Sequence, residues 1–479
     1  MMKDRPIYLV MVKVDDTKIP PFPFMILSSV LKKSGFKVKV IDCYKDDAEK
    51  IAESIIKDKP LFVGFSVLTG PPIFYSVMMS RIIKKRSPTI PIVWGGVHAS
   101  MLPEKTLGDE YIDYIIMGEG EKAISELASC ILEGKEPKEV LNLGFKRNGK
   151  VILNSKGEFI KDLDSYGMDF DCVDLNDYVY ETEHEAEGKK TSLRTMAYYG
   201  SRGCPHDCGF CYNLEYNQRR WRCYSAKKVI EDINYLKKKY GVQCIHFWDD
   251  NFFVNKSRAL EILEGIKCYS NIEIRIDYLT DDLAKQLAEL GVLYMLIGGE
   301  SGSDRILKLM KKGFKRDKLI EGAKILDRYG LNAQYSFILG IPSETEEETY
   351  ETIDIMWEIK QIHKKASFTV GVYMPYPGTE LYRLAQKNGF KEPKTTEEWS
   401  KMDRWGNTVS LPWISKHFCL NIRHLFALLS WKNPFVRSWA EFRIRHKIIN
   451  LTLDLRIIIK THTFIIRFLS KSKSLFKVR

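Results

Sequence analysis

The sequence of 479 residues is 44% apolar and 28% charged and is long enough for two or three folded domains. It has no visible signal peptide and no run of the ~18–20 apolar residues that span a bilayer, so we expect a cytoplasmic protein. The net charge of +12 is confined to residues 415–479, which contain 14 Lys or Arg and 2 Asp or Glu; the neutral remainder does not predict binding to nucleic acid.

The first 150 residues alternate between short apolar runs and amphipathic stretches. The predicted strands are Ile7–Val12, Lys37–Ile41, Leu61–Ser66, Ile92–Trp94 and Tyr114–Met117, and the predicted helices are Phe24–Ser34, Ala48–Lys57, Ile73–Lys85 and Ala123–Leu132. This alternation is typical of a parallel sheet covered on both faces. We therefore expect a doubly wound, Rossmann-like α/β domain over residues 1–150, closed by a hairpin near residues 144–154, with its ligand at the carboxyl ends of the strands.

Residues 151–194 are a predicted linker, because much of this stretch is acidic and irregular. A second series of strands and helices follows over residues 195–395. Its predicted strands are Ala197–Tyr199, Cys244–Trp248, Ile272–Ile276, Tyr294–Ile297, Ala333–Leu339 and Phe368–Met374. Six strands with intervening helices predict a partial (β/α)6 barrel whose active site faces the strand C-termini. Residues 396–479 are expected to form a basic, mainly helical segment.

Three cysteines, Cys204, Cys208 and Cys211, lie in the loop after the first strand of this second series. The other seven cysteines show no ligand spacing, which favours a reducing compartment over a disulfide scaffold. Three thiolates at this spacing can bind three irons of a 4Fe–4S cluster and leave the fourth iron without a protein ligand. A structural zinc site with His206 as fourth ligand is the alternative, although such sites usually contain paired C-x2-C units.

The C-x3-C-x2-C spacing, with aromatic Phe210 before the last cysteine, resembles the signature of the radical S-adenosylmethionine (SAM) superfamily. The resemblance implies that the open iron binds the amino and carboxylate groups of SAM, and that one electron cleaves the C–S bond to give a 5′-deoxyadenosyl radical. It also implies SAM contacts at the ends of later strands. These are Asp249, Asp250 or Asn251 for the methionine amino group, Arg275 for a carboxylate, Glu300 and Ser301 for the ribose and methionine carboxylate, and Gly340 and Pro342 for the adenine.

The first 150 residues, placed before such a barrel, resemble the cobalamin-binding domain of the anaerobic magnesium-protoporphyrin ester cyclase and radical methylase group. Residues 373–379 resemble the P-x-P-G-T segment of the same group. No Asp-x-His-x-x-Gly element supplies a lower axial cobalt ligand, and bulky Phe22 and Phe24 stand where the group often has small residues. The implied contacts with the corrin or its nucleotide tail are Ser66, Thr69, Gly95, Gly96, Glu119 and Gly120, where small residues allow close approach.

The basic C-terminal segment has a pattern of its own. Lys460 and Arg467 recur seven residues apart among isoleucines, and further lysines follow. This pattern is typical of an amphipathic helix in the interface of an anionic membrane, which predicts peripheral contact with the inner face of the membrane. A helix packed on the barrel with solvated lysines is the equal alternative.

Together these features predict a radical SAM enzyme that abstracts hydrogen from an unactivated carbon, with cobalamin assisting methylation or another modification. One alternative is cobalamin-free radical chemistry, such as cyclisation, oxidation or C–C coupling, with the N-terminal domain as a scaffold. Another is a non-catalytic metal-binding interaction protein. The expected partners are a small-molecule or lipid substrate and a one-electron donor such as ferredoxin or flavodoxin.

Overall fold

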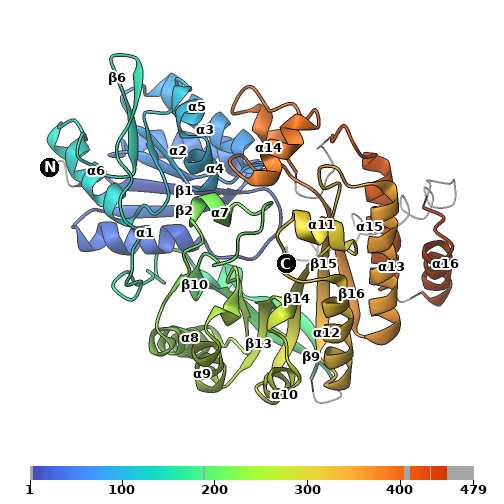
Figure 1. The fold of residues 1–479 in the computed structure, drawn as a ribbon. Helices are drawn as coiled ribbons and strands as arrows, with labels where there is room; N and C mark the ends of the chain where they lie inside the picture. The colour runs from blue at the N-terminus through green and yellow to red at the C-terminus, as the bar shows by residue number, and fades with distance from the viewer. Residues whose placement is uncertain (1–3, 187–188, 404–409, 432, 450–479) are drawn as a thin grey trace.

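The computed structural model describes residues 4–186, 189–403, 410–431 and 433–449 (Figure 1). Two seven-stranded sheets organise the chain, and helices follow at the C-terminal end. The expected fold class, an α/β protein with a Rossmann-like domain followed by a partial barrel, is confirmed.

The first sheet has the strand order β2-β1-β3-β4-β5-β6-β7. The first five strands of the chain are parallel, and β6 and β7 add an antiparallel hairpin at one edge. The order of the parallel strands is that of flavodoxin-like doubly wound sheets. The strands are β1 Ile7–Lys13, β2 Val38–Tyr44, β3 Val63–Ser66, β4 Ile92–Gly95, β5 Tyr114–Ile116, β6 Leu143–Arg147 and β7 Lys150–Leu153.

Helices cover both faces of this sheet because its central strands are apolar on both sides. In β1, Ile7 and Leu9 belong to a core that includes residues of α1 and α6, whereas Tyr8 and Val10 belong to the larger core that includes α2 and α3. The helices of this part are α1 Phe22–Lys33, α2 Ala48–Lys57, α3 Pro72–Arg86, α4 Val97–Met101, α5 Pro103–Gly108 and α6 Glu121–Glu133.

The second sheet has the order β16-β15-β14-β13-β12-β9-β8, with six parallel strands and antiparallel β8 at one edge. It curls into an open barrel covered on its outside by helices (Figure 1). The strands are β8 Tyr180–Ala186, β9 Lys189–Tyr198, β12 Cys244–Phe247, β13 Tyr269–Ile274, β14 Val292–Glu300, β15 Asn332–Leu339 and β16 Ala366–Val372; a small ribbon pairs β10 Ser201–Arg202 with β11 Arg222–Cys223.

The segment that we expected to be irregular in fact contributes to this sheet. Residues 180–186 form β8 and residues 189–194 form most of β9, and the two strands pair with each other over seven residues. Their exposed face is polar, since Ser192 donates to Glu181 across the hairpin at 2.7 Å. A polar edge hairpin lacks the apolar run by which a buried strand is recognised.

Burial alternates along β15 of the barrel. In β15, Ala333, Tyr335, Phe337 and Leu339 are buried under the surrounding helices, while Gln334, Ser336 and Ile338 face the interior and are half-buried. The helices of this part are α7 Asn213–Tyr216, α8 Ala226–Tyr240, α9 Lys256–Ile266, α10 Asp281–Glu289, α11 Asp304–Leu309, α12 Arg316–Arg328, α13 Glu346–Ile362 and α14 Glu380–Lys387.

Two helices, α15 Lys416–Leu428 and α16 Pro434–Arg445, end the described chain. α15 packs on the barrel edge, where Phe426 contacts Phe368 of β16 with 5.4 Å between ring centroids. The amphipathic pattern predicted over residues 451–469 lies outside the described residues. None of the helices in the described ranges is long and apolar enough to cross a bilayer.

Candidate active site

The carboxyl-end loops of the two sheets meet each other. The Tyr216 hydroxyl of α7 donates to the Gly118 carbonyl of the loop after β5 at 3.2 Å. The cysteine loop runs directly before α7, so it lies near this junction (Figure 1). Ligands of both sheets would thus share one region, because parallel sheets bind them at their carboxyl ends.

Backbone hydrogen bonds fix the cysteine loop at Gly209, between its second and third cysteines. Gly209 donates to the Met310 carbonyl and accepts from the Leu381 amide, each at 3.0 Å. At the start of the loop, Gly203 has φ +80°, and a Cβ there would lie 2.3 Å from the Arg220 carbonyl oxygen. Only glycine allows the chain to pass at this point.

Two side chains from neighbouring strand ends approach the thiols. The Asn251 amide nitrogen lies 4.0 Å from Cys204 Sγ, and Arg275 Nη1 lies 3.8 Å from Cys208 Sγ. Burial raises the pKa of Cys204 and raises that of Cys211 to about 12. Such thiols become thiolates when a metal binds, since coordination deprotonates them.

Phe210 and His206 of the cysteine loop contact residues outside the loop. Phe210 lies beside Lys312, whose Nζ is 5.9 Å from the ring centroid. A hydrogen bond of 2.7 Å joins His206 Nε2 and the Tyr278 hydroxyl. Across the described part of the chain, no three His, Cys, Asp or Glu side chains form a group suited to one metal ion.

Asp249 and Asp250, expected near the methionine amino group, hold the chain around the cysteine loop. Asp249 is fully buried, accepts from Ser201 Oγ and from the Gly200 amide at 3.1 Å, and burial raises its pKa to about 6. Asp250 accepts from the Gly203 amide at 3.0 Å. Asn251 keeps its Oδ1 buried without a partner among the described residues, so it is the member of this trio with a free acceptor.

Arg275 and Glu300 are both engaged in ion pairs. Arg275 forms a bidentate pair with Asp277, at 3.0 and 2.8 Å, and donates to the Lys312 carbonyl at 2.6 Å. Glu300, with φ +65°, pairs with the buried Lys312 ammonium at 2.8 Å. Ser301 is buried and its Oγ accepts from the Ser303 amide at 3.1 Å.

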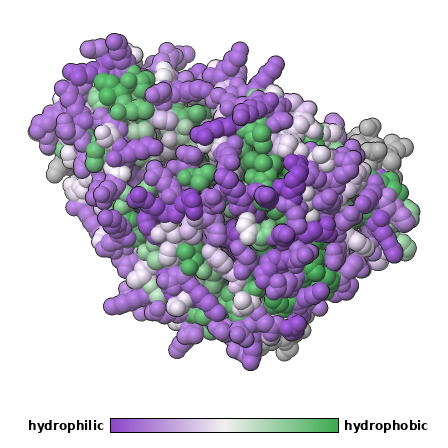
Figure 2. Space-filling model, in the orientation of Figure 1, coloured by the Kyte–Doolittle hydropathy of each residue, from purple (hydrophilic) through white to green (hydrophobic). Residues whose placement is uncertain are grey.

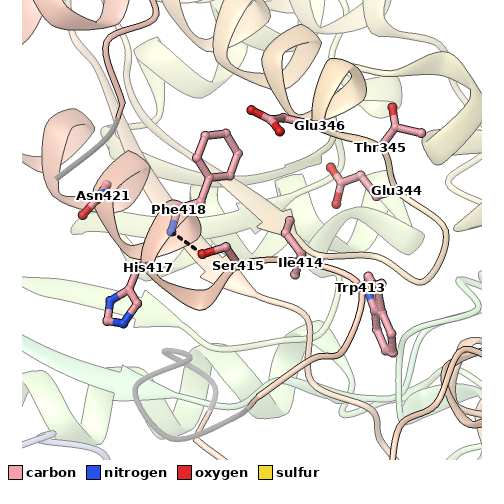
Figure 3. A pocket seen from close by; sticks show the side chains of 9 residues that line it. All are labelled: Glu344, Thr345, Glu346, Trp413, Ile414, Ser415, His417, Phe418 and Asn421. Carbon is pink, nitrogen blue, oxygen red and sulfur yellow. Dashed lines mark hydrogen bonds between the residues drawn. The ribbon is translucent and has the colours of Figure 1, made fainter.

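The loop after β15 contains Gly340 and Pro342, the expected adenine contacts. The Gly340 and Ile341 amides both donate to Glu344 Oε2, at 2.6 and 2.9 Å, and the Trp413 indole donates to the Gly340 carbonyl at 3.0 Å. Burial raises the pKa of Glu344 to about 7. An adjacent pocket of about 320 Å³ lies between this loop and the start of α15 (Figure 3), lined by Glu344, Thr345, Glu346, Trp413, Ile414, Ser415, His417, Phe418 and Asn421.

The expected cobalamin contacts occupy the ends of β3, β4 and β5. Ser66, Thr69, Gly95 and Gly96 are half-buried there. A Cβ on Gly96, at φ +88°, would lie 2.9 Å from the backbone of Val67, so this turn requires glycine. Thr69 Oγ1 lies 3.2 Å from Nδ1 of the buried His98, and desolvation lowers the pKa of that imidazole to about 4.

Phe22 and Phe24 take different positions. Phe22 packs on Tyr198 and Tyr199 of the barrel, at 6.5 and 6.1 Å between ring centroids. Phe24 is buried in the core beneath the first sheet. The two rings therefore belong to different layers, with Phe22 at the junction of the domains.

Glu119 connects the two domains. Its Oε1 pairs with Arg202 at 2.7 Å and with Arg222, and its Oε2 accepts from the Ile160 amide at 2.8 Å. Glu121 pairs with the other nitrogen of Arg202 at 2.6 Å. Gly120 lies between them at the start of α6. We call Glu119, Glu121, Arg202 and Arg222 the junction cluster; all four side chains are at most 17% exposed.

The sequence analysis missed three functional candidates. Arg202 and Arg222 belong to the junction cluster, and Glu273 faces the interior of the barrel from β13. The arginines are more than 80 positions from Glu119, so no local pattern reveals their pairing. Glu273, by contrast, is a charged residue inside an apolar strand of alternating pattern, which is a recognisable signal for an inward-facing polar side chain.

Comparisons with known proteins agree with this arrangement. Residues 198–356 match the family model of the Radical SAM superfamily, and residues 8–128 match the B12 binding domain. An uncharacterized methyltransferase of Pyrococcus horikoshii is 30% identical over 464 residues, covering 95% of this chain and 93% of the relative. The anaerobic magnesium-protoporphyrin IX monomethyl ester cyclase of Synechocystis is 26% identical, covering 78% and 74% of the two chains.

Solved structures show the same fold. The cobalamin-dependent SAM radical enzyme OxsB with aqua-cobalamin bound has a TM-score of 0.70 at 18% identity, covering 97% of this chain and 76% of that one. The radical SAM methyltransferase TsrM from Kitasatospora setae, with cobalamin and a [4Fe-4S] cluster bound, has a TM-score of 0.63 at 15% identity, covering 93% and 100%.

The chain belongs to the radical SAM superfamily, in the group with an N-terminal B12-binding domain. It is an enzyme whose cofactors are a 4Fe–4S cluster, SAM and cobalamin. The residues present fit these groups: three thiols share one loop, an amide and a guanidinium point at two of them, and glycine-lined turns end the strands of the B12-binding domain. Like other radical SAM enzymes, it needs a reductant.

Proposed function

We propose that this enzyme transfers a methyl group to an unactivated carbon of its substrate. The proposal rests on the contact between the carboxyl-end loops of the two sheets. There the Tyr216 hydroxyl donates a hydrogen bond to the Gly118 carbonyl, and Glu119 forms an ion pair with Arg202. When bound, the cluster supplies the electron that cleaves SAM, and cobalamin supplies a methyl group to a substrate radical. The methyltransferase names of the relatives from Pyrococcus horikoshii and, at 24% identity, the hopanoid C-3 methylase of Methylococcus capsulatus support methylation.

In this proposal, Cys204, Cys208 and Cys211 hold the cluster. Asn251 and Arg275 direct hydrogen-bond donors at two of the thiolate sulfurs, which stabilises their negative charge. Glu300 and Ser301 at the end of β14, and Gly340 and Pro342 after β15, would border the SAM molecule, while the Asp249 and Asp250 carboxylates hold the backbone of the cysteine loop.

The B12-binding domain would hold cobalamin at the carboxyl ends of its strands, facing the carboxyl ends of the barrel strands. Its expected contacts are Ser66, Thr69, Gly95 and Gly96, which end adjacent strands. Glu119 forms ion pairs with two arginines. We therefore propose that it holds the two domains in position and does not contact the cofactor. Fixed relative positions of two cofactors lower the barrier for transfer between them.

The test is anaerobic purification with cobalamin, reconstitution with iron and sulfide, and product analysis after reduction. We expect about four irons per chain, corrin absorption bands, and both 5′-deoxyadenosine and S-adenosylhomocysteine from SAM. The variant Cys208→Ala should lose cluster and both products but keep the corrin bands. Production of 5′-deoxyadenosine alone, with corrin present, would contradict methylation and favour cyclisation or oxidation.

We also propose ferredoxin or flavodoxin as electron donor and the surface of an anionic membrane as a further partner. On α16, Phe435 and Phe442 are 84% and 56% exposed and lie two helical turns apart. Figure 2 shows hydrophobic side chains at the edge of the molecule where this helix lies. The basic residues of the following sequence, including Lys460 and Arg467, would add attraction to anionic lipids and make a lipid substrate accessible.

A further inference from the structure

The interior face of the barrel carries polar side chains that the cofactors do not account for. Strand pairing places Asn271 of β13 between His246 of β12 and Tyr294 of β14, and Glu273 beside Leu296. All of these residues face the interior, because the alternate positions Ile272, Ile274 and Met295 are buried under the outer helices.

Glu273 contributes the carboxyl group of this face. It is half-buried and forms no hydrogen bond or ion pair with any residue that the structure describes. Arg275, two residues further along the chain, is itself paired with Asp277. Partly buried carboxylates in proteins are normally paired, so an unpaired one inside a barrel needs a ligand to explain it.

Two neighbouring side chains also have unused polar atoms. Asn271 is 3% exposed and its Oδ1 has no hydrogen-bond partner among the described residues; the same is true of the buried Trp248 Nε1. Continuing the β12–β13 register by two residues places Trp248 beside Glu273. A ligand here would therefore meet two acceptors, one donor and an indole ring, and leaving them unsatisfied costs free energy.

We propose that Glu273, Asn271 and Trp248 form the polar part of the substrate site and bind a positively charged nitrogen group, an ammonium or a guanidinium. A cation satisfies the carboxylate by charge, donates to both acceptors and contacts the indole face favourably, while the Trp248 Nε1–H requires an acceptor on another part of the same substrate. The assignment names the substrate class of the proposed enzyme and rests on the proposed function only in placing the substrate in the barrel.

The titration of Glu273 predicts a second observable effect of ligand binding, the release of a proton. Burial raises its pKa to about 8, and the carboxylates of Asp250 and Asp249 add to the rise. The ionisable groups around it are Tyr199, directly after β9, His246 of β12 and Tyr294 of β14. Without a bound ligand, the Glu273 carboxyl is thus mostly protonated at pH 7, and binding of a cation should release the proton.

The test uses the reconstituted full-length enzyme with SAM, and n-butylammonium as probe with n-butanol as its neutral counterpart. Calorimetry at pH 7 in two buffers of different ionisation enthalpy measures affinity and proton release together. We expect butylammonium to bind with release of about one proton, and Glu273→Gln to weaken binding about tenfold and abolish the release. Glu273→Asp should keep the proton release, and Glu347→Gln, an exposed acid on α13, should behave as wild type.

The controls separate failure of this inference from failure of the proposed function. Iron content, thermal stability and the SAM-dependent change in the spectrum of the reduced cluster are measured on the same samples. Equal butylammonium binding by wild type and Glu273→Gln, or equal binding of butanol and butylammonium, would overturn the assignment even if SAM is cleaved. Loss of the SAM-dependent spectral change in Glu273→Gln would also overturn it, because the residue would then serve SAM.

Discussion

At the residue scale, Asn251 offers the clearest link between side-chain chemistry and cofactor. Its amide nitrogen lies 4.0 Å from Cys204 Sγ. Donors to cluster sulfurs stabilise the more negative, reduced state and so raise the reduction potential. We expect Asn251→Leu to lower the potential of the cluster, measured by an EPR-monitored redox titration. Iron content serves as the control, and an unchanged potential with full iron would contradict the role.

The second prediction at this scale is that Glu273 makes the stability of the protein depend on pH. Its unfolded-state pKa is near 4.5 and its folded-state pKa is about 8, so between these values the native state binds more protons than the unfolded state. The stability of the wild type should therefore fall as pH rises from 4.5 to 8, and this contribution is constant outside that window. Glu273→Gln lacks the ionisation, so its Tm relative to wild type should rise between pH 5 and pH 8.

Thermal unfolding of the cluster-free protein under reducing conditions measures this difference without any ligand. Glu347→Gln again provides the matched control, as its carboxyl is exposed at the start of α13. A Tm difference between Glu273→Gln and wild type that is the same at both pH values would show that the carboxyl titrates normally and is not held in a desolvated site.

At the element scale, the junction cluster ties the loop after β5 to the ribbon β10–β11. Glu119→Gln would leave Arg202 and Arg222 with Glu121 as the one remaining carboxylate of the cluster. Removing one partner of a buried ion pair typically costs 3–5 kcal/mol, so we expect a loss of about 3 kcal/mol in the free energy of unfolding. Denaturant unfolding followed by tryptophan fluorescence measures it.

The matched control for Glu119→Gln is Glu158→Gln. Glu158 pairs with Lys161, but both side chains are about 85% exposed. Exposed pairs contribute less than about 1 kcal/mol, so this variant should unfold like wild type. Equal effects of the two variants would show that the junction cluster contributes no more than a surface pair, and that Glu119 is free for another role.

Elements with clear periodicity could be predicted from sequence, and those defined by tertiary contacts could not. The bounds of α2 agree with the predicted Ala48–Lys57, because this helix has an amphipathic pattern of its own. β8 was missed since its residues are polar and its partner is the equally polar start of β9. A hairpin at a sheet edge is specified by the pairing, which local composition does not contain.

The same distinction holds within the site. The spacing of Cys204, Cys208 and Cys211 is local, so it could be recognised directly, and the glycine turn at Gly96 is likewise a local requirement. The pairing of Glu119 with Arg202 and Arg222 joins residues more than 80 positions apart, so no local pattern indicates it, and the predicted contact of Glu119 with cobalamin stays a prediction. Glu273, by contrast, has a local signal that sequence reasoning overlooked, since a charged residue in an alternating strand predicts an inward-facing side chain.

At the scale of the whole molecule, charge and exposed aromatic side chains gather at one end of the chain. The body before Ser415 is electrically neutral, while the remainder carries the entire net charge of +12. α16 adds the exposed rings of Phe435 and Phe442 to this end. Aromatic side chains next to basic residues are the combination that holds proteins at anionic lipid surfaces, by partial insertion and by Coulomb attraction.

The double variant Phe435→Ser, Phe442→Ser should therefore reduce co-sedimentation with phosphatidylserine-rich vesicles without loss of iron. High salt should weaken binding of the wild type, because the attraction to lipid headgroups is screened beyond a Debye length of roughly 10 Å at 0.1 M salt. Phe74→Ser is the control, since Phe74 is 52% exposed on α3 of the B12-binding domain and far from α16 in sequence. If both variants sediment as wild type does, or if none of them binds vesicles, α16 faces another partner and a lipid substrate loses its structural support.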